Sequence, residues 1–160
     1  MSWHPVVVVE SGNGRFGQFI TAGHHVLGAD EPEGADGNDT GPDPFALVLA
    51  GLGACTVMTI MYADRKLMPL EKIEVRLRRL QPATAGQESR HRLERVIILR
   101  GKLTSDQRGR LLEIAEHCPV SRMLDHGAEI VSVIEDKAPS WLIVRARNRA
   151  ASRYCSSITA

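Results

Sequence analysis

The sequence predicts an α+β fold, and three observations support that prediction. The chain has 160 residues, enough for one domain with its own core. Short apolar runs bounded by glycine and proline indicate strands. The uncharged run over residues 45–63 indicates a long helix between two groups of strands. The resulting order of strands, helix, strands, helix and strand favours α+β over alternating parallel units.

The first part of the chain is expected to form a small antiparallel sheet. Residues 5–9 are Pro-Val-Val-Val-Val, typical of a strand, and residues 11–14 are Ser-Gly-Asn-Gly, typical of a turn. Residues 15–20 should therefore pair back on the first strand, and residues 23–27 should add a further one. The segment 30–44 is rich in Asp, Gly and Pro and predicts a loop.

One long helix is expected from Pro44 to about Lys66, with Pro69 marking its end. At 1.5 Å per residue such a helix spans about 30 Å. Its uncharged run approaches the length of a membrane-spanning helix. That run also contains glycine, threonine and cysteine, and the rest of the chain has the composition of a soluble domain. Burial inside a dimer is therefore the better explanation of its apolar surface.

Two strands are expected after this helix. Residues 73–78 alternate between aliphatic and charged side chains, which predicts a strand with one solvent-exposed face. Residues 81–90 predict a loop, and residues 93–99 predict the next strand. The arginines of this region are interpreted as the solvent-exposed face of the sheet: Arg76, Arg78, Arg79, Arg92, Arg95 and Arg100.

A second helix is expected to begin at Thr104, which with Gln107 forms a capping-box pattern. Pro119 ends this helix and can start another short one, with Cys118 near its N-cap. Residues 128–134 predict a last strand. The expected organisation is one domain over residues 1–144, with an edge strand at 141–144, followed by a flexible tail at 145–160 that contains Cys155.

The overall composition excludes several classes of function. The formal net charge is +1, so no global field favours nucleic acid or an anionic membrane, and aromatic residues make up only 4% of the chain. Three cysteines without a Cys-x-x-Cys motif argue against a secreted disulfide framework. The first residues lack the pattern of a signal peptide. A cytoplasmic protein with reduced thiols is expected.

Two cysteines carry the chemistry that the sequence suggests. Cys55 lies within the apolar helix, and Cys118 lies where the second helix meets a proline. Each cysteine alone could simply fill space, but both fall on apolar helix faces, and packing of the two helices would bring them together for thiol oxidation. The backbone N–H donors at the start of the short helix after Cys118 point toward negative charge and favour Cys118 as the thiol of lower pKa. Burial would raise the pKa of Cys55.

No metal or cofactor is predicted. Residues 36–41 resemble the start of a calcium loop, but Leu47 stands where the bidentate glutamate should be. His117 is interpreted as a solvated residue at the helix end, and no further zinc ligands accompany it. The sequence contains no phosphate loop, dinucleotide fingerprint or Gly-x-Ser-x-Gly elbow.

The cysteine segments resemble a known family. Residues 41–66, from Gly-Pro-Asp-Pro-Phe to Ala-Asp-Arg-Lys, are similar to the central helix of the OsmC/Ohr family, and so is the Cys-Pro segment at 118–119 with its preceding helix. Residues 29–32 and 70–77 look like an OsmC-like branch of it. The resemblance covers residues 5–135, and the two cysteine motifs together are specific.

This resemblance implies an intertwined homodimer, in which two long helices form the centre and antiparallel sheets wrap around them. It also implies a thiol peroxidase that reduces organic hydroperoxides in oxidative-stress defence. Carried over, Cys55 is the peroxidatic cysteine, which becomes a sulfenic acid. Cys118 is the resolving cysteine, which condenses with it to a disulfide, and an external dithiol restores both. The resemblance thus makes Cys55 the activated thiol, against the helix argument for Cys118, and it is preferred because an arginine supplied across a buried site can outweigh a helix start.

The sequence departs from the family pattern in one respect. Well-characterised members carry a glutamate early in the central helix that orients an activating arginine, and no glutamate is present there. Asp43 is the nearest carboxylate, and Arg15 is the only arginine before Arg65. Both are candidate catalytic residues. The competing interpretations are a helix N-terminal charge for Asp43 and a solvated turn residue for Arg15.

Three functions are therefore to be weighed. The first is a homodimeric peroxidase acting on bulky organic hydroperoxides, with no nucleic-acid or membrane partner. The second is an OsmC-like dimer that binds small apolar ligands without turnover, which the missing glutamate favours. The third is a purely structural dimer, in which replacing Cys55 has no consequence.

Overall fold

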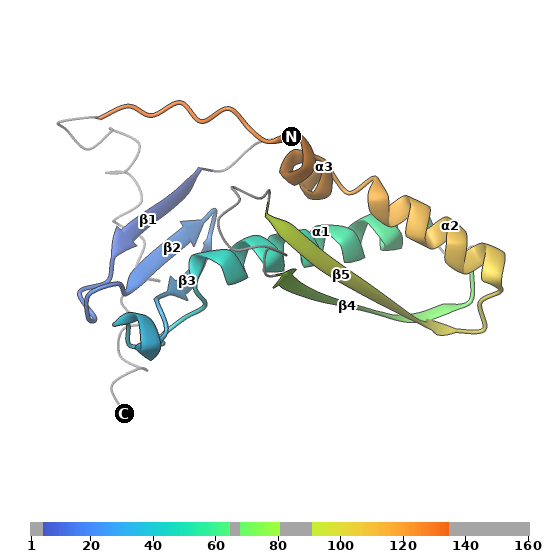
Figure 1. The fold of residues 1–160 in the computed structure, drawn as a ribbon, viewed down its shortest axis with the longest axis horizontal. Coiled ribbons are helices and arrows are strands. Elements are labelled where there is room, and N and C mark those ends of the chain that lie inside the picture. The colour runs from blue at the N-terminus through green and yellow to red at the C-terminus, as the bar shows by residue number, and fades with distance from the viewer. Residues whose placement is uncertain (1–4, 65–67, 81–90, 135–160) are drawn as a thin grey trace.

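The computed structural model describes residues 5–64, 68–80 and 91–134, and these form a mixed α+β structure with two antiparallel sheets (Figure 1). The elements in chain order are β1 (Val6–Glu10), β2 (Gln18–Ala22), β3 (His25–Ala29), the 3₁₀ helix η1 (Glu33–Ala35), α1 (Pro44–Asp64), β4 (Leu70–Leu80), β5 (Arg92–Gly101), α2 (Ser105–Glu116) and α3 (Pro119–His126). The predicted α+β class is confirmed. The predicted edge strand and tail after residue 134 lie outside the described residues.

The N-terminal sheet has the order β1-β2-β3 and confirms the predicted antiparallel meander. Its second and third strands begin a few residues later than expected, at Gln18 and His25. The reason is turn geometry: Gly12, Gly14 and Gly23 all have positive φ, so the turns extend through them. Ile20 pairs with a residue on either side and marks the middle of the sheet.

The loop between β3 and α1 is organised by one buried carboxylate. Asp30 accepts hydrogen bonds from the Thr40 hydroxyl at 2.8 Å and from the backbone N–H groups of Glu31, Asn38 and Thr40. These bonds, the Thr40 hydroxyl first, hold the pKa of Asp30 below its usual range. The carboxylate thus draws both ends of the loop together just before α1 begins.

Helix α1 begins at Pro44, as predicted, and is described to Asp64. Its first turn is capped by the Asp43 carboxylate, which accepts hydrogen bonds from the N–H groups of Phe45 and Ala46. By length and composition this is the one helix among the described residues that could cross a membrane, with a mean hydropathy of 2.0 over 44–63. Only 22% of that window is buried within the single chain.

The hairpin β4–β5 lies beside α1, and α2 packs against α1 (Figure 1). The core contains the fully buried Ile60, Leu111 and Ala115, with aliphatic residues of both strands packed against them. A register shift between Leu70 and Lys72 lets Leu70 face this core although the strand's alternation would turn it outward.

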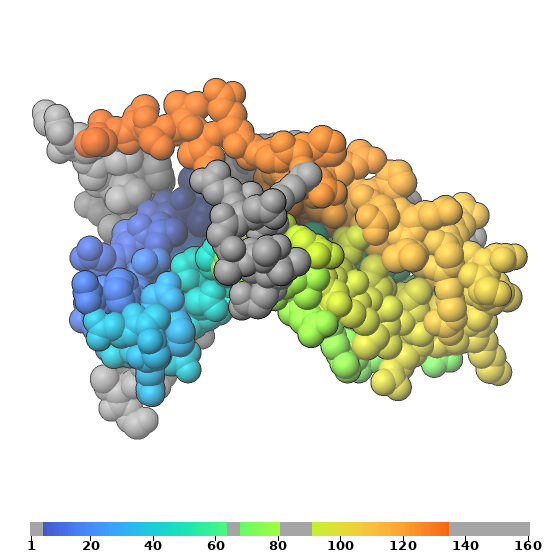
Figure 2. Space-filling view, viewed as in Figure 1, coloured from blue at the N-terminus to red at the C-terminus, as the bar shows by residue number. Residues whose placement is uncertain are grey.

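Helices α2 and α3 follow the predicted signals. Thr104 and Gln107 form both hydrogen bonds of the capping box, and Cys118 is the N-cap residue of α3. The prediction of a strand at 128–134 is wrong: these residues have no regular secondary structure, and Ile134 is 97% exposed. A strand needs a partner strand to pair with, and alternation within one segment does not provide it. In the described structure no neighbouring strand pairs with residues 128–134, and the segment projects from the body in Figure 2.

Candidate dithiol site

The fold brings Cys55 and Cys118 together. Cys55 lies in the middle of α1, and the start of α3 packs against α1 and places Cys118 beside it. The two reduced side chains are hydrogen-bonded to each other. The contact predicted from the packing of two apolar helix faces is therefore present within one chain.

Cys118 is surrounded by hydrogen-bond donors. Its side chain is fully buried, and burial alone would raise its pKa. The hydrogen bond from Cys55 opposes this effect, as do the backbone N–H groups of Ser121 and Val120 at the start of α3 and the hydroxyl of Thr56. The net result is a pKa for Cys118 below that of an ordinary thiol. This agrees with the expectation from helix-start donors, and the preferred expectation that Cys55 is the activated thiol of the pair is wrong, because burial and the bond to Cys118 raise the pKa of Cys55.

Cys55 has the opposite character. Burial raises its pKa, and the hydrogen bond that it shares with Cys118 raises it further. Cys55 is nevertheless only half-buried, whereas Cys118 has no exposed surface. The two thiols therefore differ in accessibility and in acidity: Cys55 is the more accessible and keeps its proton, whereas Cys118 is buried and ionises more readily.

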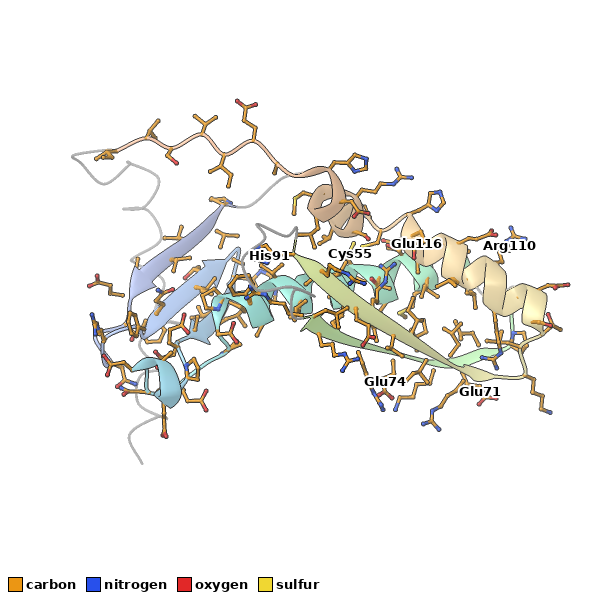
Figure 3. All side chains as sticks on the ribbon, in the orientation of Figure 1. Cys55, Glu71, Glu74, His91, Arg110 and Glu116 are labelled. Carbon is orange, nitrogen blue, oxygen red and sulfur yellow. The ribbon has the colours of Figure 1, made fainter. Side chains whose placement is uncertain are left out.

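Arg95 is a further residue of this site, and the prediction that placed it on the solvent-exposed face is wrong. Its guanidinium donates to the Thr56 hydroxyl at 3.1 Å and to the Ala115 carbonyl at 3.3 Å, and it pairs with Glu116 at 2.8 Å. Only 12% of the Arg95 side chain is exposed. Figure 3 labels Cys55 on α1 and Glu116 at the end of α2, the two helices that this arginine joins.

The signal for Arg95 was present in the sequence. In β5 the residues that face the core have odd numbers, since Ile97 and Leu99 pack there, and Arg95 continues that series. Arg92 and Arg100 have even numbers, and both are exposed. Grouping the three by residue type hid the alternation of the strand.

The other two predicted site residues do not contact the cysteines within the chain. Arg15 lies at the β1–β2 turn, pairs with Asp36 at 2.7 Å and is 70% exposed. Asp43 caps α1, and twelve residues of helical rise place it about 18 Å along the axis from Cys55. Their catalytic roles stay predictions that would require a second copy of the chain.

An apolar groove of about 360 Å³ lies between α1 and β4. Its lining consists of aliphatic and small residues: Leu49, Ala50, Gly53, Ala54, Val57, Val75 and Leu77. The α1 members of this set recur at helical spacing and exclude Cys55, which lies on another face of the helix. No group of His, Cys, Asp or Glu able to hold a metal occurs in the part of the chain that the structure describes.

The fold and the paired thiols define a class of protein, and comparison with known proteins names it. The family model described as OsmC-like protein matches residues 37–132, and the chain belongs to this family. No curated protein matches the chain.

Solved structures share the fold. An OsmC-like protein from Mycoplasma pneumoniae has a TM-score of 0.63 at 15% identity, over 78% of this chain and 88% of that one. An organic hydroperoxide resistance protein OsmC from Legionella pneumophila has a TM-score of 0.58 at 21% identity, over 78% and 90%. The organic hydroperoxide resistance protein OhrB of Bacillus subtilis has a TM-score of 0.50 at 21% identity, over 76% and 89%.

Proposed function

We propose that this protein is a cysteine-based peroxidase that reduces organic hydroperoxides through Cys55 and Cys118. The observation that supports this most directly is the hydrogen bond between the two thiols. Two sulfurs that share a hydrogen bond are neighbours, so their further approach to the bonding distance of about 2.05 Å can close a disulfide. Two neighbours of the same fold are named organic hydroperoxide resistance proteins.

The first step is attack by Cys55, because its sulfur is the more accessible of the two. Its proton moves to the Cys118 thiolate as the Cys55 sulfur bonds to the terminal peroxide oxygen. The O–O bond breaks, Cys55 becomes a sulfenic acid, and the departing alkoxide takes a proton to become an alcohol. The peroxide is reduced by two electrons, and the Cys55 sulfur is oxidised by the same two.

The second step closes the disulfide. Cys118 loses its proton again, and its thiolate attacks the Cys55 sulfenic sulfur, displacing hydroxide that leaves as water. The lowered pKa of Cys118 favours this attack at neutral pH. An external dithiol then reduces the disulfide and restores both thiols by exchange. The balance is one peroxide and two thiols converted to one alcohol, one water and one disulfide.

The working form of this peroxidase is a cytoplasmic homodimer in our proposal. Large apolar side chains stand exposed along α1, including Phe45, Val48, Met58, Met61 and Tyr62. An apolar strip of this extent on one helix is typical of an interface rather than a solvated surface. A second α1 packed on it would also shield the half-exposed Cys55 and favour bulky alkyl peroxides.

The alternative is a dimer that binds small apolar ligands without turnover. It is favoured by the position of Asp43, which caps α1 and leaves the dithiol site without a nearby orienting carboxylate from the start of that helix. The binding protein and the peroxidase would have the same fold and the same groove, so only a test of thiol oxidation distinguishes them.

Intact mass after one equivalent of cumene hydroperoxide tests the proposal. A peroxidase loses about two hydrogen atoms per chain on disulfide formation, and neither Cys55→Ser nor Cys118→Ser loses them. A Cys155→Ser variant is the matched control and should lose them as the parent does. Unchanged thiols at stoichiometric peroxide would favour the binding protein.

A further inference from the structure

The Thr56 hydroxyl links a cation to the dithiol pair. Thr56 is fully buried on α1, next in sequence to Cys55, and its hydroxyl oxygen accepts a hydrogen bond from the Arg95 guanidinium at 3.1 Å. The same hydroxyl hydrogen-bonds with Cys118 and favours its ionised form. A path of two hydrogen bonds therefore runs from Arg95 to the Cys118 sulfur.

The donor count at Thr56 explains how this path acts. A hydroxyl has one proton to donate, and Arg95, which can only donate, occupies an acceptor position on the oxygen. The Thr56 proton is thus available for two acceptors, the Leu52 carbonyl at 2.8 Å and the Cys118 sulfur. The Leu52 carbonyl is a neutral acceptor within the helix, whereas the Cys118 thiolate is charged and forms the stronger hydrogen bond with the Thr56 hydroxyl. Ionisation of Cys118 would therefore draw the proton toward sulfur.

Arg95 also fixes the backbone that carries Cys118. Its second bond from the same nitrogen goes to the Ala115 carbonyl at 3.3 Å, which also accepts the backbone N–H of Cys118 at 3.2 Å. A cation at the carbonyl end of α2 is favourable. This contact holds the turn between α2 and α3, from which Val120 and Ser121 direct their N–H groups at the sulfur.

We propose that Arg95 is a positioning residue of the dithiol site, which orients the Thr56 hydroxyl and the α2–α3 turn so that Cys118 serves as the proton acceptor for Cys55. The inference rests on the dithiol chemistry proposed above. It assigns the cation to β5 of the same chain, whereas the sequence suggested Arg15. Thr56 is the intermediary, and Glu116 holds the outer side of the guanidinium.

Several other charged or titratable groups lie on the elements around Cys118. Glu116 is 61% exposed and pairs with Arg95. The ring of His117 is bonded to the Glu113 carbonyl at 2.8 Å, and Arg122 on α3 donates its backbone N–H to the Cys118 carbonyl. The interactions of the Glu116 carboxylate and the His117 ring engage groups other than the Cys118 sulfur, so the test concentrates on Thr56 and Arg95.

The test is a pH titration of thiolate ultraviolet absorbance without peroxide, in a Cys55→Ser, Cys155→Ser background that leaves Cys118 as the one thiol. Thr56→Val keeps the shape of the side chain but removes the hydroxyl. It should raise the apparent pKa of Cys118 by about one pH unit or more, because a hydrogen bond to a charged group is lost. Thr56→Ser should restore most of the original value. Arg95→Met should raise it similarly, and Arg95→Lys, which cannot make the same fork of bonds, should give an intermediate value.

Arg108→Met is the matched control, since Arg108 also donates to a backbone carbonyl, that of Leu99, but on the far end of α2. It should leave the Cys118 titration unchanged. The inference is overturned if Thr56→Val titrates as the parent does, or if Arg108→Met raises the pKa as much as Arg95→Met. Should Arg95→Met not fold, Arg95→Lys takes its place, and an Arg95→Lys protein that titrates as the parent does would overturn the role of Arg95. Because no peroxide is present, failure here is distinct from failure of the peroxidase proposal.

Discussion

At the scale of single residues, the site depends on an asymmetry between two thiols. Cys118 has donors on several sides and a lowered pKa, whereas Cys55 has a raised pKa and partial exposure. In a coupled pair the first proton lost belongs to the pair as a whole. The structure favours a monoanion in which Cys55 donates its S–H to the Cys118 sulfur, which keeps a proton at the accessible sulfur until a peroxide arrives.

Replacing either cysteine by serine should have a different outcome. With Cys118→Ser in a Cys155→Ser background, no thiol of the chain is left to condense with the sulfenic acid, so Cys55 should accumulate as the sulfenic acid after peroxide addition. With Cys55→Ser, the remaining buried thiol should react at least tenfold more slowly, an order-of-magnitude expectation from its lack of access. A sulfenic-acid-specific probe followed by mass spectrometry checks both. Labelling of Cys118 in the Cys55→Ser variant at the parent rate would reverse the assignment.

The rate of thiol oxidation should depend on pH in a defined direction. In the proposed first step Cys55 attacks as its proton moves to the Cys118 thiolate, so the rate should follow the fraction of Cys118 that is ionised, which rises as pH increases through the pKa. Because the pKa of Cys118 is lowered, the rate in the parent should reach half of its maximum below the value of about 8.5 for a free thiol. Stopped-flow measurements over a pH series check this. A midpoint at or above the free-thiol value would mean that the donors around Cys118 do not govern reactivity.

The residue scale also shows where sequence reasoning was sufficient. Helix electrostatics at the Cys-Pro junction favoured Cys118 as the thiol of lower pKa, in agreement with the structure, whereas the preferred prediction, from the family resemblance, was activation of Cys55. Arg95 was missed because it was grouped with Arg92 and Arg100 by type, although strand alternation separates them. Its partner Thr56 gave no signal, since a hydroxyl inside a helix usually bonds only its own backbone, as Thr56 does with Leu52.

At the scale of elements, the connections determine how the site is held. The buried Asp30 carboxylate closes the loop before α1, and Asp43 caps the first turn of that helix. At the other end, Arg95 ties β5 to the last turn of α2. Helix α1 therefore reaches the dithiol site as a long element supported at its start and along its length.

Asp30→Asn should destabilise this loop at neutral pH. One carboxylate oxygen of Asp30 accepts from the N–H groups of Asn38 and Thr40, and the other accepts from that of Glu31. In asparagine an NH₂ group replaces one of these oxygens and would face N–H donors that it cannot accept. The pKa of Asp30 is lowered in the folded state. Its contribution to stability is therefore present above the ordinary aspartate pKa of about 3.9 and is lost as pH falls through the lowered value.

Thermal melting over a pH series checks this prediction. The parent should lose stability more steeply than Asp30→Asn as the solution becomes acidic, and the two melting temperatures should converge at low pH. Asp36→Asn is the matched control, since its exposed carboxylate pairs with the exposed Arg15. Parallel curves for the parent and Asp30→Asn would contradict the assignment of the acid-sensitive contact to this loop.

The elements show a similar division between what the sequence predicts and what it does not. Proline and the capping box located the starts of α1 and α2, because these signals act within one turn of helix. The starts of β2 and β3 shifted because positive-φ glycines lengthened the turns. The strand predicted at 128–134 failed because pairing needs a partner strand, which alternation in one segment does not reveal.

At the scale of the whole molecule, the single chain leaves much apolar surface uncovered. The exposed side chains of α1 and the projecting segment that contains Ile130 and Ile134 both lack a covering layer. Figure 2 shows the segment standing away from the body as an extended arm. These surfaces are consistent with the proposed homodimer, whose pairing geometry a single chain does not contain.

Met58→Glu should convert the proposed dimer to a monomer. Met58 is 60% exposed on α1, and a carboxylate buried in an apolar helix–helix contact would be strongly unfavourable. Light scattering coupled to gel filtration measures the mass directly. Lys102→Glu, on the exposed turn between β5 and α2, is the control and should remain dimeric. A monomeric parent, or a Met58→Glu protein of dimeric mass, would contradict the proposed interface.

Peptide mapping of the oxidised protein tests the central claim most directly. After treatment with one equivalent of cumene hydroperoxide and blocking of remaining thiols, non-reducing digestion should release a peptide pair joined by Cys55 and Cys118, with Cys155 blocked. Recovery of both blocked as free thiols, or of Cys55 joined to Cys155 or to a second Cys55 instead, would contradict the account.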